Sequence, residues 1–279
     1  MRRVSVSTAL FDGYPLELAI EAIARAGAAY VEPAFIRGYV DFDETAFLPP
    51  SADKLDRLIR QAGLRPLAVS AHFDLAAPES GSMLARRIDF AARLGAPFLI
   101  TNSGKAAQRD AVLATLHAAI RQCRDAGVVL ALENPGHGTG DCIASGADGM
   151  ALVAEIGSEH VRLNYDAGNI LTASHMALRP ETDIARALPA IAHLHLKDVA
   201  ECGPDWCFTP LGEGMVDFRA LWRQLPPNLP LGIELPLRLR RPGRADPIRS
   251  PQPLPLPVLT EALQSSLALV ERLDGRSGG

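Results

Sequence analysis

Short apolar runs recur eight times along this chain, and each is followed by a segment whose apolar residues have helical spacing. Runs of this length, bounded by Gly, Pro or Asn, are typical of strands that are buried on both faces of a parallel sheet. The pattern predicts strands over residues 3–8, 29–34, 65–73, 97–103, 127–134, 160–167, 192–198 and 230–235.

Amphipathic segments alternate with these runs, and several end on the glycine expected just past a helix, such as Gly95, Gly127 and Gly157. The predicted helices cover residues 16–26, 51–62, 83–94, 106–126, 146–157, 181–190, 217–225 and 258–273. The sequence has no clear antiparallel hairpin signal, and it lacks the glycine-rich first turn of an open doubly wound sheet. The alternation therefore predicts an α/β protein built as a (β/α)₈ TIM barrel.

The length of the chain fits one such barrel, so residues 1–279 are expected to form a single domain. Residues 236–257 stand apart because they are rich in Pro and Arg and are too long for an ordinary connection. We expect a long loop there. It could be a lid, an anion-holding loop or a subunit contact, or it could be a solvated excursion.

Charge and composition exclude several classes of partner. The net charge is -4 and the charges are well mixed, so nucleic acid is not an expected partner. No run approaches the roughly 18 apolar residues of a membrane span, and no signal peptide precedes Asp12, so a cytoplasmic protein without a membrane partner is expected. The four cysteines lack zinc-binding spacing and are expected to be ordinary thiols in a reducing compartment.

Four side chains of metal-ligand type end predicted strands: Glu133, Asp166, His195 and Glu234. The carboxyl ends of barrel strands share one rim, so these groups should converge. Three carboxylates and one imidazole suit a single divalent ion, with Mn²⁺ as the first expectation and Mg²⁺, Co²⁺ or Zn²⁺ as alternatives. By strand alternation His193 points to the same face and is a lesser candidate.

Five motifs accompany these residues: LENPG at Glu133, LNYDAGN at Asp166, HLHLKD at residues 193–198, PLGEGMVDF at residues 210–218 and GIELP at Glu234. In this order they resemble the xylose isomerase-like TIM-barrel superfamily, which holds sugar isomerases and epimerases, inosose dehydratases and endonuclease IV. The resemblance covers nearly the whole chain. It implies that Glu133, Asp166, His195 and Glu234 bind the metal, and that Glu133 and Glu234 serve as acid and base beside a substrate carbonyl.

Further side chains are placed at strand ends where they could contact a substrate. His72 could orient a hydroxyl, carry a proton or be a structural histidine, and Glu32 could bind a sugar hydroxyl or pair with a basic neighbour. Lys197 and Asp198 could contact the substrate or simply pair with each other. The complete set of expected substrate-binding residues is His72, Glu32, Asn102, Asn134, Asn169, Lys197 and Asp198.

The chain departs from the pattern of some relatives. Asn169 stands where tagatose-type epimerases and endonuclease IV carry a histidine, which leaves the particular sugar open. Asn102, Trp206 and Phe208 stand where endonuclease IV carries ligands of two further zinc ions, so only one metal site is expected and abasic-site cleavage is not. Trp206 and Phe208 could form an apolar wall for a substrate or could simply pack.

The leading interpretation is a metal-dependent isomerase or epimerase of a monosaccharide or sugar acid, working through an enediolate. An inosose-type or keto-sugar dehydratase is the alternative, with His72 or Lys197 as proton donor to the leaving hydroxyl. A non-catalytic sugar-binding barrel is less favoured because both glutamates are present. No glycine-rich phosphate cradle follows the last two strands, which favours an unphosphorylated substrate. The oligomeric state is left open, with a homo-oligomer as one option.

Overall fold

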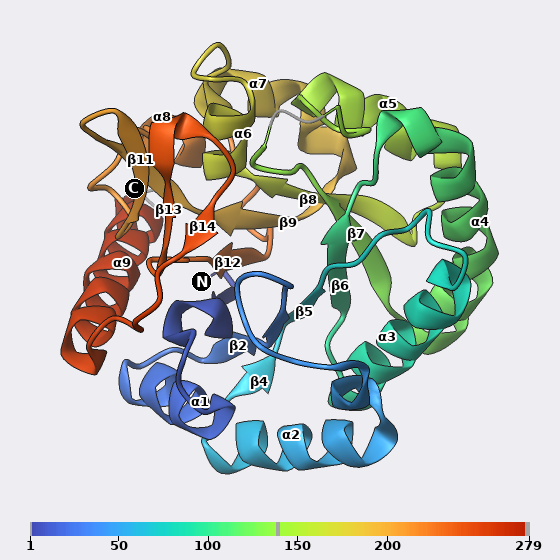
Figure 1. The fold of residues 1–279 in the computed structure, drawn as a ribbon, viewed down its shortest axis with the longest axis horizontal. Helices are drawn as coiled ribbons and strands as arrows, with labels where there is room; N and C mark the ends of the chain where they lie inside the picture. The colour runs from blue at the N-terminus through green and yellow to red at the C-terminus, as the bar shows by residue number, and fades with distance from the viewer. Residues whose placement is uncertain (1, 138–139, 277–279) are drawn as a thin grey trace.

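The computed structural model describes residues 2–137 and 140–276, and its strands form a closed barrel inside a ring of helices (Figure 1). The fold is therefore the predicted (β/α)₈ barrel of the α/β class. Each predicted strand is found. The barrel strands are β1 (Val4–Ser7), β2 and β3 (Tyr30–Glu32, Ala34–Phe35), β4 and β5 (Arg65–Pro66, Ala68–Ala71), β6 (Phe98–Asn102), β7 (Val129–Glu133), β8 (Val161–Asp166), β9 (Ile191–Leu196) and β12 (Leu231–Ile233).

Parallel pairing closes the ring. The second strand of the barrel is divided into β2 and β3 at Pro33, which has no N–H to donate, and the third is divided into β4 and β5 at Leu67. These pieces pair in the same order, β2 with β4 and β3 with β5. At the other end of the strand order β12 pairs with both β9 and β1, and β1 pairs with β2. All the carboxyl ends consequently lie at one rim.

The helices outside the barrel follow the predicted order. Left-handed glycines end three of them, at Gly95, Gly127 and Gly157. The α-helices that match predicted ones are α1 (Leu16–Arg25), α2 (Pro49–Gln61), α3 (Ser80–Leu94), α4 (Arg109–Ala126), α5 (Gly146–Ile156), α7 (Pro180–Ala187), α8 (Phe218–Trp222) and α9 (Leu256–Arg276). Short 3₁₀ turns are η1 (Thr8–Phe11), η2 (Glu44–Phe47), η3 (Ala106–Gln108), η4 (Leu188–Ala190) and η5 (Pro242–Arg244).

One helix was not predicted. The helix α6 (Ala167–Ala173) begins directly after β8, without a connecting loop. Its N-cap is Asp166, whose side chain accepts a hydrogen bond from the Asn169 N–H at 2.8 Å. The strand end and the helix start share this one carboxylate, so the sequence offers no separate turn signal between them.

Two hydrophobic clusters fill the space outside and inside the ring of barrel strands. The larger cluster joins the helices to the outer faces of the strands. A smaller one contains Phe98, Ile100 and Ala131, and the Phe98 ring centroid lies 5.6 Å from that of His193. This apolar layer fills the barrel interior beneath the polar residues of the rim.

A second, antiparallel sheet lies over the rim and corrects the expectation that the chain has no hairpin. It consists of β10 (Asp198–Cys202), β11 (Asp205–Thr209), β13 (Leu239–Arg241) and β14 (Ile248–Arg249). The turn between β10 and β11 is Gly203–Pro204, a pair of turn-forming residues that is compatible with a hairpin. Cys202 and Cys207 are joined across this hairpin as a disulfide, whereas the sequence led us to expect ordinary thiols.

Residues 236–257, expected as a loop, contain β13, η5 and β14 and are held to the barrel by ion pairs. Arg238 and Arg249 both bind Asp12, and Arg249 also binds Asp41. Arg244 pairs with Glu201 on β10. The segment is thus a fixed strap across one side of the rim, in the sector between α8 and α9 (Figure 1).

Among the described residues, no helix combines the length and the apolar character needed to cross a membrane.

Candidate metal and substrate site

Glu133, Asp166, His195 and Glu234 converge at the rim as their positions predict. Glu133 and Asp166 are the last residues of β7 and β8, His195 lies near the end of β9, and Glu234 directly follows β12. One ligand-type atom from each of them lies within 4.8 Å of the others. All four residues are at most 3% exposed, so the group lies inside the barrel mouth.

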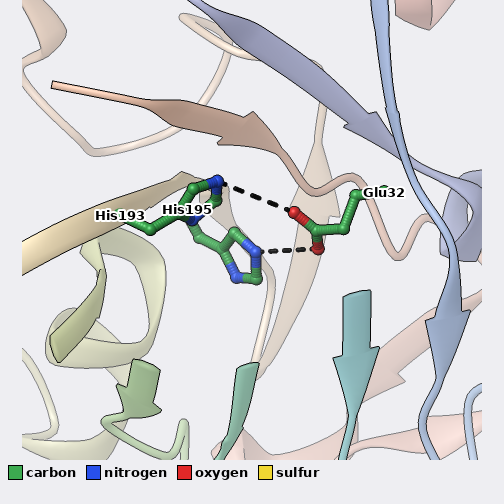
Figure 2. A group of neighbouring side chains, drawn as sticks. All are labelled: Glu32, His193 and His195. Atoms are coloured by element: carbon green, nitrogen blue, oxygen red, sulfur yellow. Dashed lines mark hydrogen bonds and ion pairs between the residues drawn. The ribbon is translucent and has the colours of Figure 1, made fainter. Parts of the chain in front are cut away.

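His195 presents its Nδ1 to the three carboxylates. The Nδ1 atom lies 3.1 Å from Glu133 Oε1, 3.3 Å from Glu234 Oε2 and 3.8 Å from Asp166 Oδ2. The opposite ring nitrogen, Nε2, lies 2.9 Å from Glu32 Oε1 (Figure 2). The imidazole is therefore oriented with one nitrogen toward the acidic group and the other toward a separate carboxylate.

Lys197 supplies positive charge at the same point. Its Nζ lies 2.6 Å from Asp166 Oδ2 and 2.6 Å from Glu234 Oε2, and it donates a hydrogen bond to Asn169 Oδ1 at 3.2 Å. Lys197 alone cannot balance three buried carboxylates, and a buried negative charge is stable only when it is paired, so His195, a proton on a carboxylate or a bound cation must supply the remaining positive charge.

The donor set fits a divalent cation. In the described part of the chain, Glu133 Oε2, Asp166 Oδ2 and Glu234 Oε2 make ion pairs but no well-directed hydrogen bond. Three carboxylates with an imidazole nitrogen are ligands that Mn²⁺ and Mg²⁺ accept. This buried cluster could hold one such ion.

The carboxylates titrate very differently because their neighbours differ. Burial alone would raise the pKa of Glu133, but His195 and His72 hold it well below its usual range. Burial likewise opposes the effect of Lys197 and His195 on Glu234, whose pKa falls to about 2. Burial raises the pKa of Asp166 to about 8, because Lys197 only partly offsets it and the charges of Glu133 and Glu234 add to it. The two glutamates are thus ionised at neutral pH.

The cations are shifted in the complementary direction. Burial would lower the pKa of His195, but Glu32, Glu133 and Glu234 raise it well above its usual value. For Lys197 burial is likewise outweighed, by Asp166 and Glu234, and its pKa is also raised. Both side chains are therefore protonated in the metal-free protein, and a proton must leave His195 before its Nδ1 can serve as a ligand.

A cavity of about 520 Å³ opens above this group. Four of the expected substrate-binding residues line it, namely His72, Asn102, Asn169 and Lys197. The His72 Nε2 atom lies 3.0 Å from Glu133 Oε2. Glu133 and Glu234 also face the cavity, so a ligand in it would contact both glutamates.

The other three expected substrate-binding residues do not line the cavity. Glu32 lies behind His195 and is fully buried. Asn134 binds the main chain of Asp166 through both ends of its amide, at 2.9 and 3.0 Å. Asp198 accepts hydrogen bonds from the main-chain N–H groups of residues 199, 212, 214 and 216, and does not pair with Lys197.

Three further candidates also lie away from the cavity. His193 Nδ1 lies 2.8 Å from Asn164 Oδ1, and burial lowers the pKa of His193 to about 3, so its ring is neutral. Trp206 and Phe208 pack with Val199 in a small apolar cluster of the hairpin. Their role in this structure is packing.

The family of the chain can be stated on this geometry together with its sequence. A model of the xylose isomerase-like TIM barrel family matches residues 20–245. The chain belongs to this family. Comparison with curated proteins finds no significant match.

Solved structures with the xylose isomerase-like fold superpose on nearly the whole chain. D-psicose 3-epimerase from Clostridium cellulolyticum H10 has a TM-score of 0.76 at 13% identity, covering 97% of this chain and 99% of that one. 3-Keto-D-glucoside 4-epimerase from E. coli has a TM-score of 0.69 at 16% identity, with 98% and 100% covered. A xylose isomerase-like protein from Mycobacterium smegmatis, in complex with magnesium, has a TM-score of 0.73 at 15% identity, with 99% and 98% covered. At these identities the likeness shows the shared fold.

Sequence reasoning missed several residues that line the cavity of this xylose isomerase-like barrel. Tyr39 lies in the loop after β3, and its ring packs against the hairpin cluster. Burial raises its pKa to about 12, so its hydroxyl remains a donor. Arg37, Asp74, His137 and Asp246 also line the cavity from loops. The only sequence feature that indicates a role for these residues is that they follow strand ends, where the loops of a barrel form its active site.

Proposed function

We propose that the protein is a metal-dependent epimerase or isomerase of an unphosphorylated monosaccharide or sugar acid. The observation that carries this proposal is the pairing of Glu133 and Glu234, two ionised carboxylates that face one cavity beside a cluster able to hold a divalent ion. Similar folds in D-psicose 3-epimerase and 3-keto-D-glucoside 4-epimerase support it.

Glu133, Asp166, His195 and Glu234 would hold the ion, with Mn²⁺ or Mg²⁺ as the best fit to the donor set. Magnesium in the similar Mycobacterium smegmatis structure agrees with this choice. When bound, the ion would polarise the carbonyl of a sugar and stabilise the negative charge of an enediolate.

The two glutamates would move the proton. One glutamate would remove the proton from the carbon beside the carbonyl. The other would first take up a proton from solvent or from a neighbouring side chain, and would then deliver it to the opposite face for epimerisation or to the neighbouring carbon for isomerisation, while the first glutamate releases its proton to solvent. His72 lies 3.0 Å from Glu133 Oε2 and can stabilise that carboxylate or share its proton. Lys197 can stabilise Glu234 in the same way, since its Nζ lies 2.6 Å from Glu234 Oε2.

Neutral donors and acceptors would orient the substrate. Asn102 and Asn169 line the cavity and can bind the hydroxyl groups of a sugar. Tyr39 adds a hydroxyl donor beside an aromatic ring, and Lys197 could bind a carboxylate or a developing oxyanion. This set favours a polyhydroxylated substrate.

A dehydratase is the second candidate, because a specific group could act as its acid. His72 lines the cavity and contacts Glu133 while remaining partly accessible from the cavity. If a β-hydroxyl of the substrate lay near His72, proton donation from the imidazole would expel it as water after the first proton abstraction.

Hydrogen exchange distinguishes the candidates. The protein is incubated with Mn²⁺ or Mg²⁺ in D₂O and a panel of keto-sugars, sugar acids and inososes, and the products are followed by NMR. We expect deuterium at a carbon-bound position with the sugar skeleton retained, and a drop of about 10²-fold or more in Glu133→Gln and Glu234→Gln. Asp183→Asn serves as the control, because Asp183 is buried between Gly146 and Tyr165, away from the cavity lining.

Loss of a hydroxyl with deuterium entry would establish the dehydratase instead. Exchange that is equal in the parent and in both glutamine variants would refute the proposed roles of the glutamates. Metal binding without exchange on any member of the panel would favour a sugar-binding protein.

A further inference from the structure

Glu32 lies on the side of His195 that faces away from the three carboxylates. Glu32 Oε1 is 2.9 Å from His195 Nε2 (Figure 2). His195 Nδ1 is directed to Glu133 and Glu234. The two ring nitrogens therefore have carboxylate neighbours on opposite sides of the imidazole. Glu133 and Glu234, next to Nδ1, border the cavity, whereas Glu32, next to Nε2, does not.

The carboxylate of Glu32 is itself held in place. Ser70 Oγ donates to Oε1 at 2.9 Å, and Ser5 Oγ lies 3.5 Å from Oε2. Both serines and Glu32 are fully buried. A carboxylate that is buried and fixed by hydroxyl donors cannot turn toward a ligand in the cavity, so its effect must pass through the residue it contacts.

The side chains around Gly232 leave no room for a Cβ atom at this position. A Cβ atom at Gly232 would lie 2.8 Å from Glu32 Oε2, 2.9 Å from His193 Cε1 and 3.0 Å from His195 Cδ2. The barrel strand β12 thus approaches the pair of Glu32 and His195 as closely as its backbone permits, which fixes the plane of the imidazole.

The position of Glu32 favours hydrogen on Nε2 of the neutral ring, and Asn164 Nδ2, which lies 3.0 Å from Nδ1, favours the same form. A neutral imidazole has one N–H donor and one lone pair. A carboxylate acceptor at Nε2 stabilises the hydrogen on that atom and leaves the lone pair on Nδ1, where a metal ion held by the carboxylates would need it.

We propose that Glu32 is a positioning residue, which fixes His195 as the Nε2–H tautomer and so prepares Nδ1 as a metal ligand. The proposal rests on the metal dependence included in the proposed function. It assigns to Glu32 no contact with the substrate and no place in the coordination sphere.

The same side chains could instead be taken as a second metal site, because ligand-type atoms of Glu32, His193 and His195 also lie within 4.8 Å of one another. His195 would then have to give both nitrogens to ions. His193 offers little, since its Nδ1 already contacts Asn164 and its Nε2 lies 3.9 Å from Glu32 Oε2. One ion per chain is therefore expected.

The test measures metal binding without substrate. Mn²⁺ and Mg²⁺ are titrated into metal-free parent, Glu32→Ala, Glu32→Gln and Asp183→Ala by calorimetry, and the melting temperature of each metal-free protein is recorded. We expect one ion per chain, about 10- to 100-fold weaker binding in Glu32→Ala, and recovery of much of that loss in Glu32→Gln, whose amide oxygen can still accept from Nε2–H. Asp183→Ala removes a buried carboxylate elsewhere in the barrel and should lower the melting temperature without changing the affinity.

Long-range ¹H–¹⁵N spectra of the metal-free protein with labelled histidine report the tautomer itself. They are recorded above the pH at which His195 loses its second proton, because an ion on Nδ1 would by itself force the hydrogen onto Nε2. We expect the Nε2–H form for His195 in the parent and in Glu32→Gln, and its loss in Glu32→Ala.

Parent-like affinity and tautomer in Glu32→Ala, or two ions per chain in the parent, would overturn the proposal. None of these measurements of metal affinity, melting temperature and tautomer requires sugar turnover. A parent protein that binds one ion but exchanges no sugar hydrogen would refute the proposed function alone.

Discussion

The ammonium of Lys197 lies 2.6 Å from Glu234 Oε2, inside the barrel mouth, and the residue is only 1% exposed. It is equally close to Asp166 Oδ2, so one fixed cation binds two of the carboxylates assigned to the metal. Lys197 therefore contributes to the same charge balance as a bound ion would.

Replacing Lys197 with methionine should make the stability of the protein depend more strongly on metal. The variant keeps most of the length of the side chain but leaves Asp166 and Glu234 without their cation, which costs about 3–5 kcal/mol for a broken buried pair. We expect a lower melting temperature in the metal-free protein, and a larger rise on adding Mn²⁺ than in the parent. Differential scanning calorimetry with and without Mn²⁺ measures both.

Lys54→Met is the matched control, because Lys54 pairs with Glu17 on the surface with 66% of its side chain exposed. Its effect should be no more than about 1 kcal/mol, with or without metal. An equal metal-induced rise in Lys197→Met and the parent would contradict the role given to Lys197.

Gly232→Ala should weaken metal binding without any change in the ligands. The added methyl group would lie within 3.0 Å of Glu32, His193 and His195, in a region without free space. We expect a destabilisation of about 1–3 kcal/mol from overpacking and a measurable loss of Mn²⁺ affinity, since His195 must shift. Urea unfolding and calorimetric titration measure these two effects.

Gly81→Ala is the control for this substitution. Gly81 lies in α3, and a Cβ there would meet nothing within 4 Å, so the variant should be as stable as the parent or up to about 1 kcal/mol more stable. Unchanged metal binding in both variants would show that the imidazole tolerates the methyl group.

The barrel and its four rim residues could be predicted from the sequence because both follow from local patterns. Short apolar runs mark the strands, and Glu133 and Asp166 stand where those runs end. Strand alternation also puts His193, His195 and Lys197 on one face. Alternation does not give the position of each side chain along the barrel axis. In the structure His193 lies against Phe98, below the four rim residues, and Lys197 lines the cavity.

Partners that are distant in the sequence could not be predicted. Asp198 binds main-chain groups 14 to 18 residues further along the chain, in a turn whose shape no local signal gives. The contact of Glu32 with His195 joins residues 163 positions apart. The sequence shows that Glu32 ends a strand, but the choice between the cavity and the neighbouring imidazole depends on how the closed barrel packs.

Asp12→Ala should loosen the strap formed by residues 236–257. The Asp12 carboxylate accepts hydrogen bonds from Arg238 at 3.1 Å and from Arg249 at 2.7 Å. Without it two guanidinium groups lose their common partner, and local opening of the strap should become about tenfold more frequent, equal to ~1.4 kcal/mol. Limited trypsin digestion, followed by mass spectrometry of cuts at Arg238 to Arg249, measures this rate.

Asp41→Ala is the comparison for the strap, because Asp41 is exposed and binds only Arg249 of the two. We expect a clearly smaller increase in cleavage than in Asp12→Ala. Equal rates in the two variants would mean that Asp12 does not hold the strap.

The stability of the barrel should fall in acid partly through Glu44. Glu44 binds Arg87 at 2.8 and 3.1 Å, and the Arg87 guanidinium also donates to the Met83 carbonyl and lies over the rings of Phe47 and Phe73. The hydrogen bonds from Arg87 hold the pKa of Glu44 below its usual value, against a smaller opposing effect of burial. The folded protein therefore binds fewer protons at this site than the unfolded chain. The stabilisation is fully present above the unfolded pKa of about 4.3, and it is lost as the pH falls through the lower folded value.

Glu44→Gln isolates this contribution. At pH 7 the variant should be about 1–2 kcal/mol less stable than the parent, a value reduced from that of a fully buried pair because Glu44 is partly exposed. As the pH falls below about 4 the two unfolding free energies should converge, because a protonated Glu44 no longer pairs with Arg87 as an anion. Urea unfolding of both proteins at pH 7, 5 and 3.5 tests this. Asp53→Asn is the control, because it removes the exposed pair of Asp53 and Arg93 and should not change the unfolding free energy resolvably. A difference between Glu44→Gln and the parent that stays constant down to pH 3.5 would mean that Glu44 stabilises the barrel through its packing and not through its charge.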